Sequence, residues 1–298
     1  MYHNPVLLHK SIDGLQVKPE GTYVDATFGG GGHSSAILKK LTGGRLFAFD
    51  QDNDALQNVI DDERFMLINQ NFRYIKNFLK LHGVTTIDGL LADLGVSSHQ
   101  FDVAERGFST RLNGQLDMRM NKNTPLTAHD IVNTFSLEDL NKVLKELGEL
   151  PNSYKVAQAI VSSRETQEIN TTTELVNAVQ SCFPKNKLNK SLAMLFQGLR
   201  IYVNDEISAL RELLTQATEL LVPGGRLVVI SYHSLEDRLV KNLIKTGNFE
   251  GKLEKDFYGN PELKYKAVNR KVIVADEIEI ETNSRARSAR LRIAEKIL

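Results

Sequence analysis

The first third of the chain alternates short apolar runs with segments of helical spacing. The apolar runs predict strands near residues 23–26, 45–50, 65–68 and 87–93. Helical spacing follows the first three runs, near residues 34–41, 53–60 and 71–82. Ser34 or Ser35 is expected to cap the first of these helices, and Gly43-Gly44 to end it. Strands that alternate with helices predict a parallel sheet with right-handed crossovers.

The middle of the chain has a different pattern. From about Pro125 to Ala209 no segment resembles a buried strand, and amphipathic helices are predicted near 126–135, 137–147, 154–164, 173–182, 190–204 and 206–221. Ser136 and the segment Thr171–Glu174 are expected to cap two of them.

Apolar runs then resume, with strands predicted near residues 223–231, 263–268 and 289–294. A helical block thus interrupts an α/β sheet. We expect a Rossmann-like domain built from residues 1–110 and 207–298, with an inserted all-helical domain at 111–206.

Composition narrows the class of protein only in part. The 37 basic and 37 acidic residues give zero formal charge, so nucleic-acid binding cannot be argued from the net charge. A single cysteine, Cys182, excludes an intramolecular disulfide and a cysteine-based metal site. With no signal peptide or membrane span in the pattern, a cytoplasmic protein is expected. Near the C-terminus an acidic cluster is followed by the arginines 285, 287, 290 and 292.

Four consecutive glycines, Gly29–Gly32, join the first strand to its helix, and three predicted strands end in Asp25, Asp50 and Asp93. This arrangement is typical of a nucleotide-type site at the carboxyl edge of a sheet. Asp50 follows the glycines at the spacing of an acid that binds a ribose diol. Ser34 occupies the place of the third glycine of a dinucleotide motif. The carboxylates therefore favour a cationic sulfonium, as in S-adenosylmethionine, over a pyrophosphate.

Other chemistries fit the sequence less well. A phosphate-binding P-loop would need a Gly-Lys-Ser/Thr, and a serine hydrolase would need G-x-S-x-G, and neither is present. His233, Glu236 and Asp237 invite a metal site, but histidines at matching spacing are absent, and no metal is expected. A nicotinamide oxidoreductase remains a distant alternative.

The polar clusters resemble those of one family, the MraW (RsmH) methyltransferases. The matching segments run in order along the chain: 3–8 (HNPVLL), 25–34 (DATFGGGGHS), 48–52 (AFDQD), 93–98 (DLGVSS), 105–109 (ERGFS), 116–120 (LDMRM), 199–204 (LRIYVN), 231–238 (SYHSLEDR) and 285–290 (RARSAR). Lys10 and Gly198 depart from the family pattern, away from the predicted site.

This resemblance implies a class I S-adenosylmethionine-dependent methyltransferase that modifies N4 of a cytidine in the decoding region of 16S rRNA of the small ribosomal subunit. It implies cofactor contacts by Gly31, Gly32, His33, Asp50, Phe72, Asp93 and Gln100. A homodimer is left open. The alternatives are a methyltransferase of another nucleic acid and a non-catalytic RNA-binding factor in ribosome assembly.

The catalytic hypothesis centres on Asp93, His233 and Tyr232, which can accept a proton or orient the base. The segment after Asp93 lacks the Pro-Pro-aromatic motif of general amino-methyltransferases. The catalytic residues therefore have less motif support than the cofactor-binding residues. Substrate binding is expected at Arg106, Phe108, Asp117, Met118, Arg119, Arg200, Asn204, Arg285, Arg287 and Arg290.

Overall fold

The computed structural model describes residues 5–297, so that His3 and Asn4 of the first family-like segment lie outside it. The chain divides into two compact units. A sheet unit runs up to Gly95 and resumes at Ile207, and a helical unit spans Val96–Glu206. The first boundary thus falls earlier than the expected position at residue 110.

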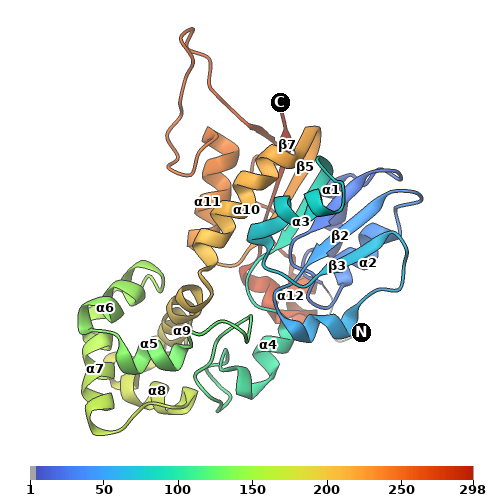
Figure 1. The fold of residues 1–298 in the computed structure, drawn as a ribbon. Helices are drawn as coiled ribbons and strands as arrows, with labels where there is room; N and C mark the ends of the chain where they lie inside the picture. Colours follow the sequence, from blue (N-terminus) through green and yellow to red (C-terminus); the bar gives the residue numbers. More distant parts are fainter. Residues whose placement is uncertain (1–4, 298) are drawn as a thin grey trace. The chain divides into compact units, whose positions relative to one another are not determined.

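The sheet unit contains a seven-stranded sheet in the order β3-β2-β1-β4-β5-β7-β6 (Figure 1). The strands are β1 (Thr22–Asp25), β2 (Arg45–Phe49), β3 (Phe65–Ile68), β4 (Ile87–Asp93), β5 (Leu221–Ser231), β6 (Tyr265–Ala267) and β7 (Arg290–Lys296). Strands β1 to β5 pair in parallel, whereas β7 is antiparallel to both β5 and β6. The expected Rossmann-like α/β sheet is confirmed.

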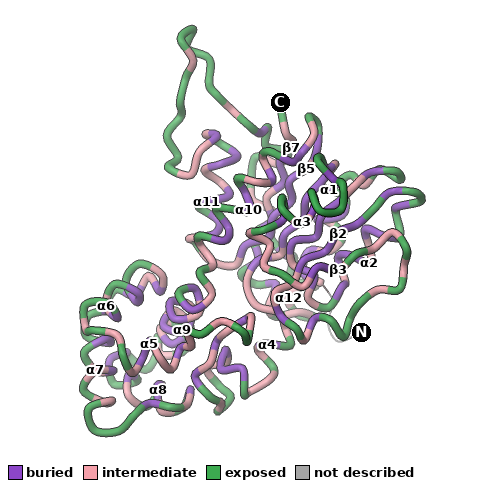
Figure 2. The backbone as a smooth tube through the Cα atoms, viewed as in Figure 1, coloured by how far each residue is buried: buried purple, intermediate pink, exposed green. Residues whose placement is uncertain are grey.

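Helices cover both faces of this sheet, because successive strand residues point to opposite sides. Val24, Leu90 and Val229 pack into one core, shared with α3 (Ile75–Leu81), α10 (Glu206–Leu220) and α11 (Ser234–Thr246). Tyr23 and Leu91 pack into the other, shared with α1 (Leu8–Leu15) and α2 (Gly32–Leu38). The strands are accordingly buried over much of their length (Figure 2).

Several local features differ from the sequence expectations. The segment Asn53–Asn58 is a 3₁₀ helix (η1), and the helix after β3 is split into η2 (Phe72–Tyr74) and α3. Helix α2 begins at Gly32 with Gly31 as its N-cap, so the expected cap at Ser34 or Ser35 is wrong. Helices α1, α11 and α12 (Glu277–Thr282) and the 3₁₀ helix η6 (Ser284–Ser288) have no counterpart among the expected elements.

The helical unit contains α4 (Ser98–Asp102), η3 (Ala104–Arg106), α5 (Ala128–Thr134), α6 (Leu137–Glu146), α7 (Ser153–Thr166), α8 (Thr172–Val179), η4 (Gln180–Cys182), η5 (Lys185–Lys187) and α9 (Leu188–Asn204). Ser136 caps α6, and Thr171 forms a capping box with Glu174 at α8, as predicted. Phe101 and Phe108 pack into the core of this unit, which explains why residues 96–110 belong to it.

Candidate active site

The order of the strands reverses between β1 and β4, which lie side by side in the centre of the sheet. In doubly wound folds this switch point is where ligands bind, outside the carboxyl ends of the strands. Asp25 is the last residue of β1, and Asp93 is the last residue of β4. Asp50 directly follows β2. The fold therefore brings the three carboxylates predicted from the sequence to one edge.

The glycine loop follows β1 at this edge. Gly29 has a φ of 51°, and a Cβ added to Gly29 or Gly30 would meet no atom within 4 Å. These two residues thus present bare backbone to open space. The sequence alone does not distinguish them from the neighbouring Gly31 and Gly32. Gly31 and Gly32, the predicted contacts, are closed in: their Cβ atoms would meet the Phe28 ring and Pro5.

Asp50 holds this loop in place. Its Oδ2 accepts a hydrogen bond from the Gly29 N–H at 2.8 Å, and its Oδ1 accepts one from the Asp52 N–H at 2.8 Å. Asn58 donates to the Gly29 carbonyl at 3.1 Å and fixes the loop from the other side. The role of Asp50 toward a ribose remains a prediction.

Asp93 lies among three side chains that come from different elements. Its Oδ1 accepts a hydrogen bond from the Tyr232 hydroxyl at 2.7 Å, and its Oδ2 lies 4.0 Å from His33 Nδ1. Its backbone N–H donates to Thr27 Oγ1 at 2.6 Å. The other nitrogen of His33 faces the Val6 carbonyl at 3.1 Å. Asp93 is thus fixed in position while its side chain stays 21% exposed.

Burial is the main influence on the titration of these groups. It raises the pKa of Asp25, Asp50 and Asp93 to about 6 each, although hydrogen bonds partly offset it. Burial also lowers the pKa of His33, so a neutral imidazole is favoured. Among the described residues, no lysine or arginine pairs with the three carboxylates. An edge of this kind favours a bound cation.

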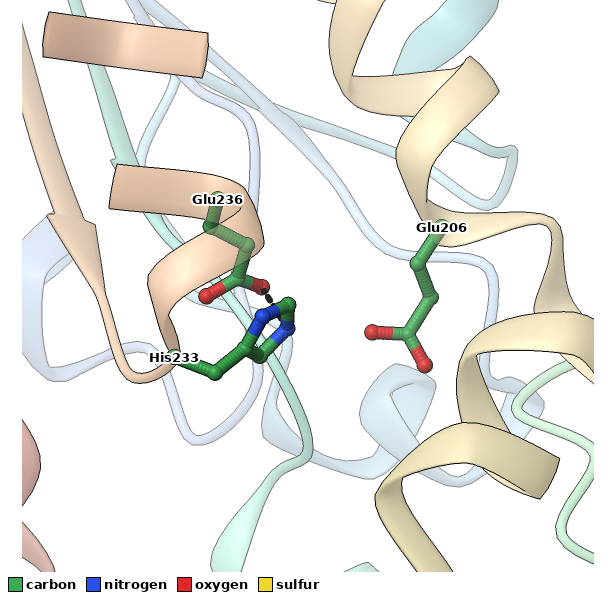
Figure 3. A group of neighbouring side chains, drawn as sticks. All are labelled: Glu206, His233 and Glu236. Atoms are coloured by element: carbon green, nitrogen blue, oxygen red, sulfur yellow. Dashed lines mark ion pairs between the residues drawn. The ribbon is translucent and has the colours of Figure 1, made fainter. Parts of the chain in front are cut away.

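His233 and Glu236 stand at the start of α11, beyond the end of β5 (Figure 3). His233 Nε2 lies 3.2 Å from Glu236 Oε1, and the other carboxylate oxygen accepts the Tyr232 N–H at 2.9 Å. Glu236 is 3% exposed and holds the turn that carries Tyr232. This role of Glu236 does not follow from the sequence pattern. Glu206, also drawn, belongs to the helical unit.

The remaining predicted cofactor contacts are Phe72 and Gln100. Phe72 opens η2 after β3 and packs, half buried, against the core that contains β2. Gln100 belongs to the helical unit, where its side-chain oxygen accepts the Ser97 N–H at 3.0 Å in a capping box. A cofactor contact by either residue stays a prediction.

The substrate residues predicted in the helical unit are largely occupied by one another. Arg106 is 4% exposed and donates to the carbonyls of Arg119 and Met120 at 2.9 and 3.1 Å. Asp117 forms a bidentate ion pair with Arg119, with N–O distances of 2.9 and 2.7 Å. Burial alone would raise the pKa of Asp117, but the hydrogen bonds from Arg119 outweigh it and the pKa is lowered.

The rest of this set shows the same internal use. Arg200 pairs with both carboxylate oxygens of Glu206 at 2.8 and 2.9 Å. Asn204 accepts the Met120 N–H at 2.7 Å and donates to the Met118 carbonyl at 2.8 Å. Phe108 and Met118 are buried. These residues hold the unit together, and their contact with a substrate remains a prediction.

The predicted arginine tail lies on the sheet unit. Arg285 and Arg287 are in η6, and Arg290 begins β7, where it is paired in register with Ser231 at the end of β5. Arg287 and Arg290 are exposed, and Arg285 is half buried. The arginine tail therefore leads into β7 at the same edge of the sheet at which the carboxylates lie.

The sheet order, the glycine loop and the strand-end carboxylates define a Rossmann-like domain of the class I S-adenosylmethionine-dependent methyltransferases. The chain belongs to the MraW methylase family, whose model matches residues 1–297. No helix in the described part of the chain has the length and apolar character needed to cross a membrane.

Curated relatives of high similarity carry the name ribosomal RNA small subunit methyltransferase H. Those from Flavobacterium johnsoniae and Bacteroides thetaiotaomicron are each 57% identical, over 297 and 296 residues. The alignments cover 99% of this chain and 98% and 97% of the two relatives. A relative from Bacteroides fragilis is 55% identical over 296 residues, covering 99% of this chain and 97% of its own.

Proposed function

We propose that this protein transfers a methyl group from S-adenosylmethionine to the N4 amino group of a cytidine in the decoding region of 16S rRNA. The observation that carries the proposal is the 57% identity, along 99% of the chain, to relatives named ribosomal RNA small subunit methyltransferase H. The choice of N4 and of the decoding region rests on the family resemblance of the sequence motifs. The small subunit as partner and a cytoplasmic location belong to the same proposal.

The residues present fit the methyl donor. The open backbone at Gly29 and Gly30 leaves room for a ligand, and the carboxylates at the strand ends suit its positive charges. Bound there, the donor supplies an activated methyl group, so that the protein mainly has to align the reactants. Asp50, Phe72 and His33 would hold it, together with Gly31 and Gly32.

Asp93 is the residue best placed to act on an amino group. At pH 7 its carboxylate, with a pKa raised to about 6 by burial, is mostly ionised and can accept a hydrogen bond from an exocyclic amine. That contact localises the lone pair of the amine, and the same carboxylate can then take the proton released after transfer. Tyr232 orients Asp93 through its 2.7 Å hydrogen bond, and His233 is the second candidate base.

Tyr232 is the proposed stacking partner of a base that must leave its helical stack. The arginines at 285, 287 and 290 would neutralise the phosphates of the RNA backbone. Contact of the RNA with residues of the helical unit remains a separate prediction, for Arg106, Phe108, Asp117, Met118, Arg119, Arg200 and Asn204.

The decisive experiment supplies labelled donor to the protein with three acceptors: small ribosomal subunits from a strain lacking this gene, deproteinised 16S rRNA, and DNA. Nucleosides are then identified by mass spectrometry. N4-methylated cytidine from the ribosomal samples is the expected product. Methylated DNA would support a methyltransferase of another nucleic acid, and RNA binding without product would support an assembly factor.

A further inference from the structure

A surface concavity of the sheet unit lies between α11 and the strands β6 and β7, outside the residues assigned so far. Four of its eight lining residues are basic and none is acidic. The residues that matter here are Lys241, Lys245, Asn269, Arg270 and Arg292. We call this surface the basic concavity.

Most of this positive charge is not neutralised by the protein. Arg292 pairs with both carboxylate oxygens of Asp237, at 2.7 and 3.0 Å. Within the described part of the chain, Lys241, Lys245 and Arg270 form no ion pair. Lys241 and Lys245 are also four residues apart on α11, a spacing at which like charges destabilise a helix. Folding alone therefore does not explain this cluster.

The backbone that carries Arg270 is fixed before any ligand arrives. Asn269 Oδ1 accepts the Ile293 N–H of β7 at 3.0 Å, and its side-chain amide donates to the Lys271 carbonyl at 2.6 Å. Asp237 likewise fixes the guanidinium of Arg292. A preorganised cationic surface loses little conformational entropy when it binds.

Ordinary structural roles account for part of the cluster only. Lys245 lies in the last turn of α11, where a cation complements the helix dipole. This role does not require Lys241 and Arg270 to line the same concavity as Lys245.

Strand direction relates the basic concavity to the active edge. Strand β6 is antiparallel to β7, which is antiparallel to β5, so β6 and β5 point the same way. Arg270 follows β6 and therefore lies toward the edge at which β5 ends, before Tyr232. An RNA backbone held at Arg270 would therefore lie on the side of the sheet unit toward that edge.

We infer that the basic concavity binds the sugar–phosphate backbone of the RNA substrate. The inference takes the identity of that RNA from the proposed function. Guanidinium and ammonium groups without acidic partners are the donors that bind phosphate oxygens. Such contacts position an RNA independently of its base sequence.

The test compares K241A/K245A and Arg270→Ala with the wild type. A matched control is Lys80→Ala, which removes an exposed lysine from the last turn of α3. Binding to small subunits lacking the mark is measured without donor at several salt concentrations. We expect affinity to fall roughly tenfold in the double variant. The slope of log K against log salt should become shallower by about 0.7 to 0.9 for each phosphate that the variant no longer neutralises.

Affinity and salt slope equal to those of the wild type in both test variants would overturn the inference. Donor binding, measured by calorimetry, checks that each variant is folded. If the wild type produces methylated cytidine and the variants bind as it does, the role of the basic concavity is refuted and the proposed reaction stands. Wild-type binding without product refutes the proposed reaction alone, and no wild-type binding refutes both.

Discussion

The two units use acidic side chains in opposite ways. At the sheet edge Asp25, Asp50 and Asp93 are held by backbone N–H and hydroxyl groups, and burial raises the pKa of each to about 6. In the helical unit Asp117 and Glu206 each meet an arginine through two hydrogen bonds. The first arrangement leaves negative charge for a ligand, and the second neutralises it internally.

The contacts of a charged side chain therefore distinguish a functional role from a structural one better than its residue type does. Both units contain clusters of acids and arginines that the sequence alone marks as candidate sites. The structure shows that in the helical unit those charges are largely used to hold loops and helix ends. Substitutions at the sheet edge should therefore change activity first, and substitutions in the helical unit should change stability first.

The largest expected effect is that of Asp93→Ala on methylation. Removing a group that positions the amine and accepts its proton should lower turnover roughly a hundredfold to ten-thousandfold. Turnover is measured with small subunits that lack the mark. The melting temperature should change little, because the removed carboxylate is itself costly to bury.

Asp88→Ala is the matched control, since it removes a carboxylate from the other end of the same strand. Asp88 accepts the Thr22 N–H at 3.0 Å and pairs with Lys18 at 3.1 Å, far along β4 from the carboxyl edge. Asp88→Ala should keep its turnover. Full turnover by Asp93→Ala would remove Asp93 from the mechanism.

The sheet was predictable because alternation of apolar runs and helical spacing recurs along the chain. All seven strands lie where those runs predict them, and the strand ends deliver the three carboxylates together. The motif 231–238 indicates only a polar cluster when taken alone, although Leu235, Leu239 and Leu243 have the spacing of the helix that α11 proves to be.

Details that depend on tertiary contacts were not predictable. Ser34 is a good N-cap by residue type, but its hydroxyl donates to Asp25 at 2.7 Å, and Gly31 is the N-cap of the helix instead. The sequence pattern changes near Pro125, and the boundary was expected at residue 110. The division after Gly95 follows from Phe101 and Phe108, whose packing into the helical core no local pattern reveals.

A smaller effect, on stability, is expected for Arg106→Met. The guanidinium is buried and donates to two carbonyls, which the substitution would leave without these donors. The free energy of unfolding in urea should fall by about 3 kcal/mol. Arg111→Met, at an exposed arginine nearby, should stay within about 0.5 kcal/mol of the wild type. Equal stability of both variants, with a raised KM for RNA at Arg106→Met, would assign Arg106 to the substrate instead.

The smallest expected effect is on the pH dependence of stability. It compares the two kinds of carboxylate directly, with the variants Asp25→Asn and Asp117→Asn. The folded-state pKa of Asp25, about 6, exceeds the unfolded value, so the native protein binds the extra proton and its stability decreases as pH rises from about 4 to 6. Asp25→Asn removes this dependence. Its stability relative to the wild type should improve by about 2 kcal/mol between pH 4 and pH 7.

Asp117 should behave in the opposite direction. Burial raises its folded-state pKa, but hydrogen bonds from Arg119 outweigh burial and lower it, so its contribution to stability is present above the unfolded pKa and disappears in acid. Asp117→Asn should therefore cost about 1 kcal/mol at pH 7 and progressively less below pH 4. Urea unfolding of both variants and the wild type across this range measures the two slopes. If the stability differences of the two variants change with pH in the same direction, the pKa values of Asp25 and Asp117 are not shifted in opposite directions.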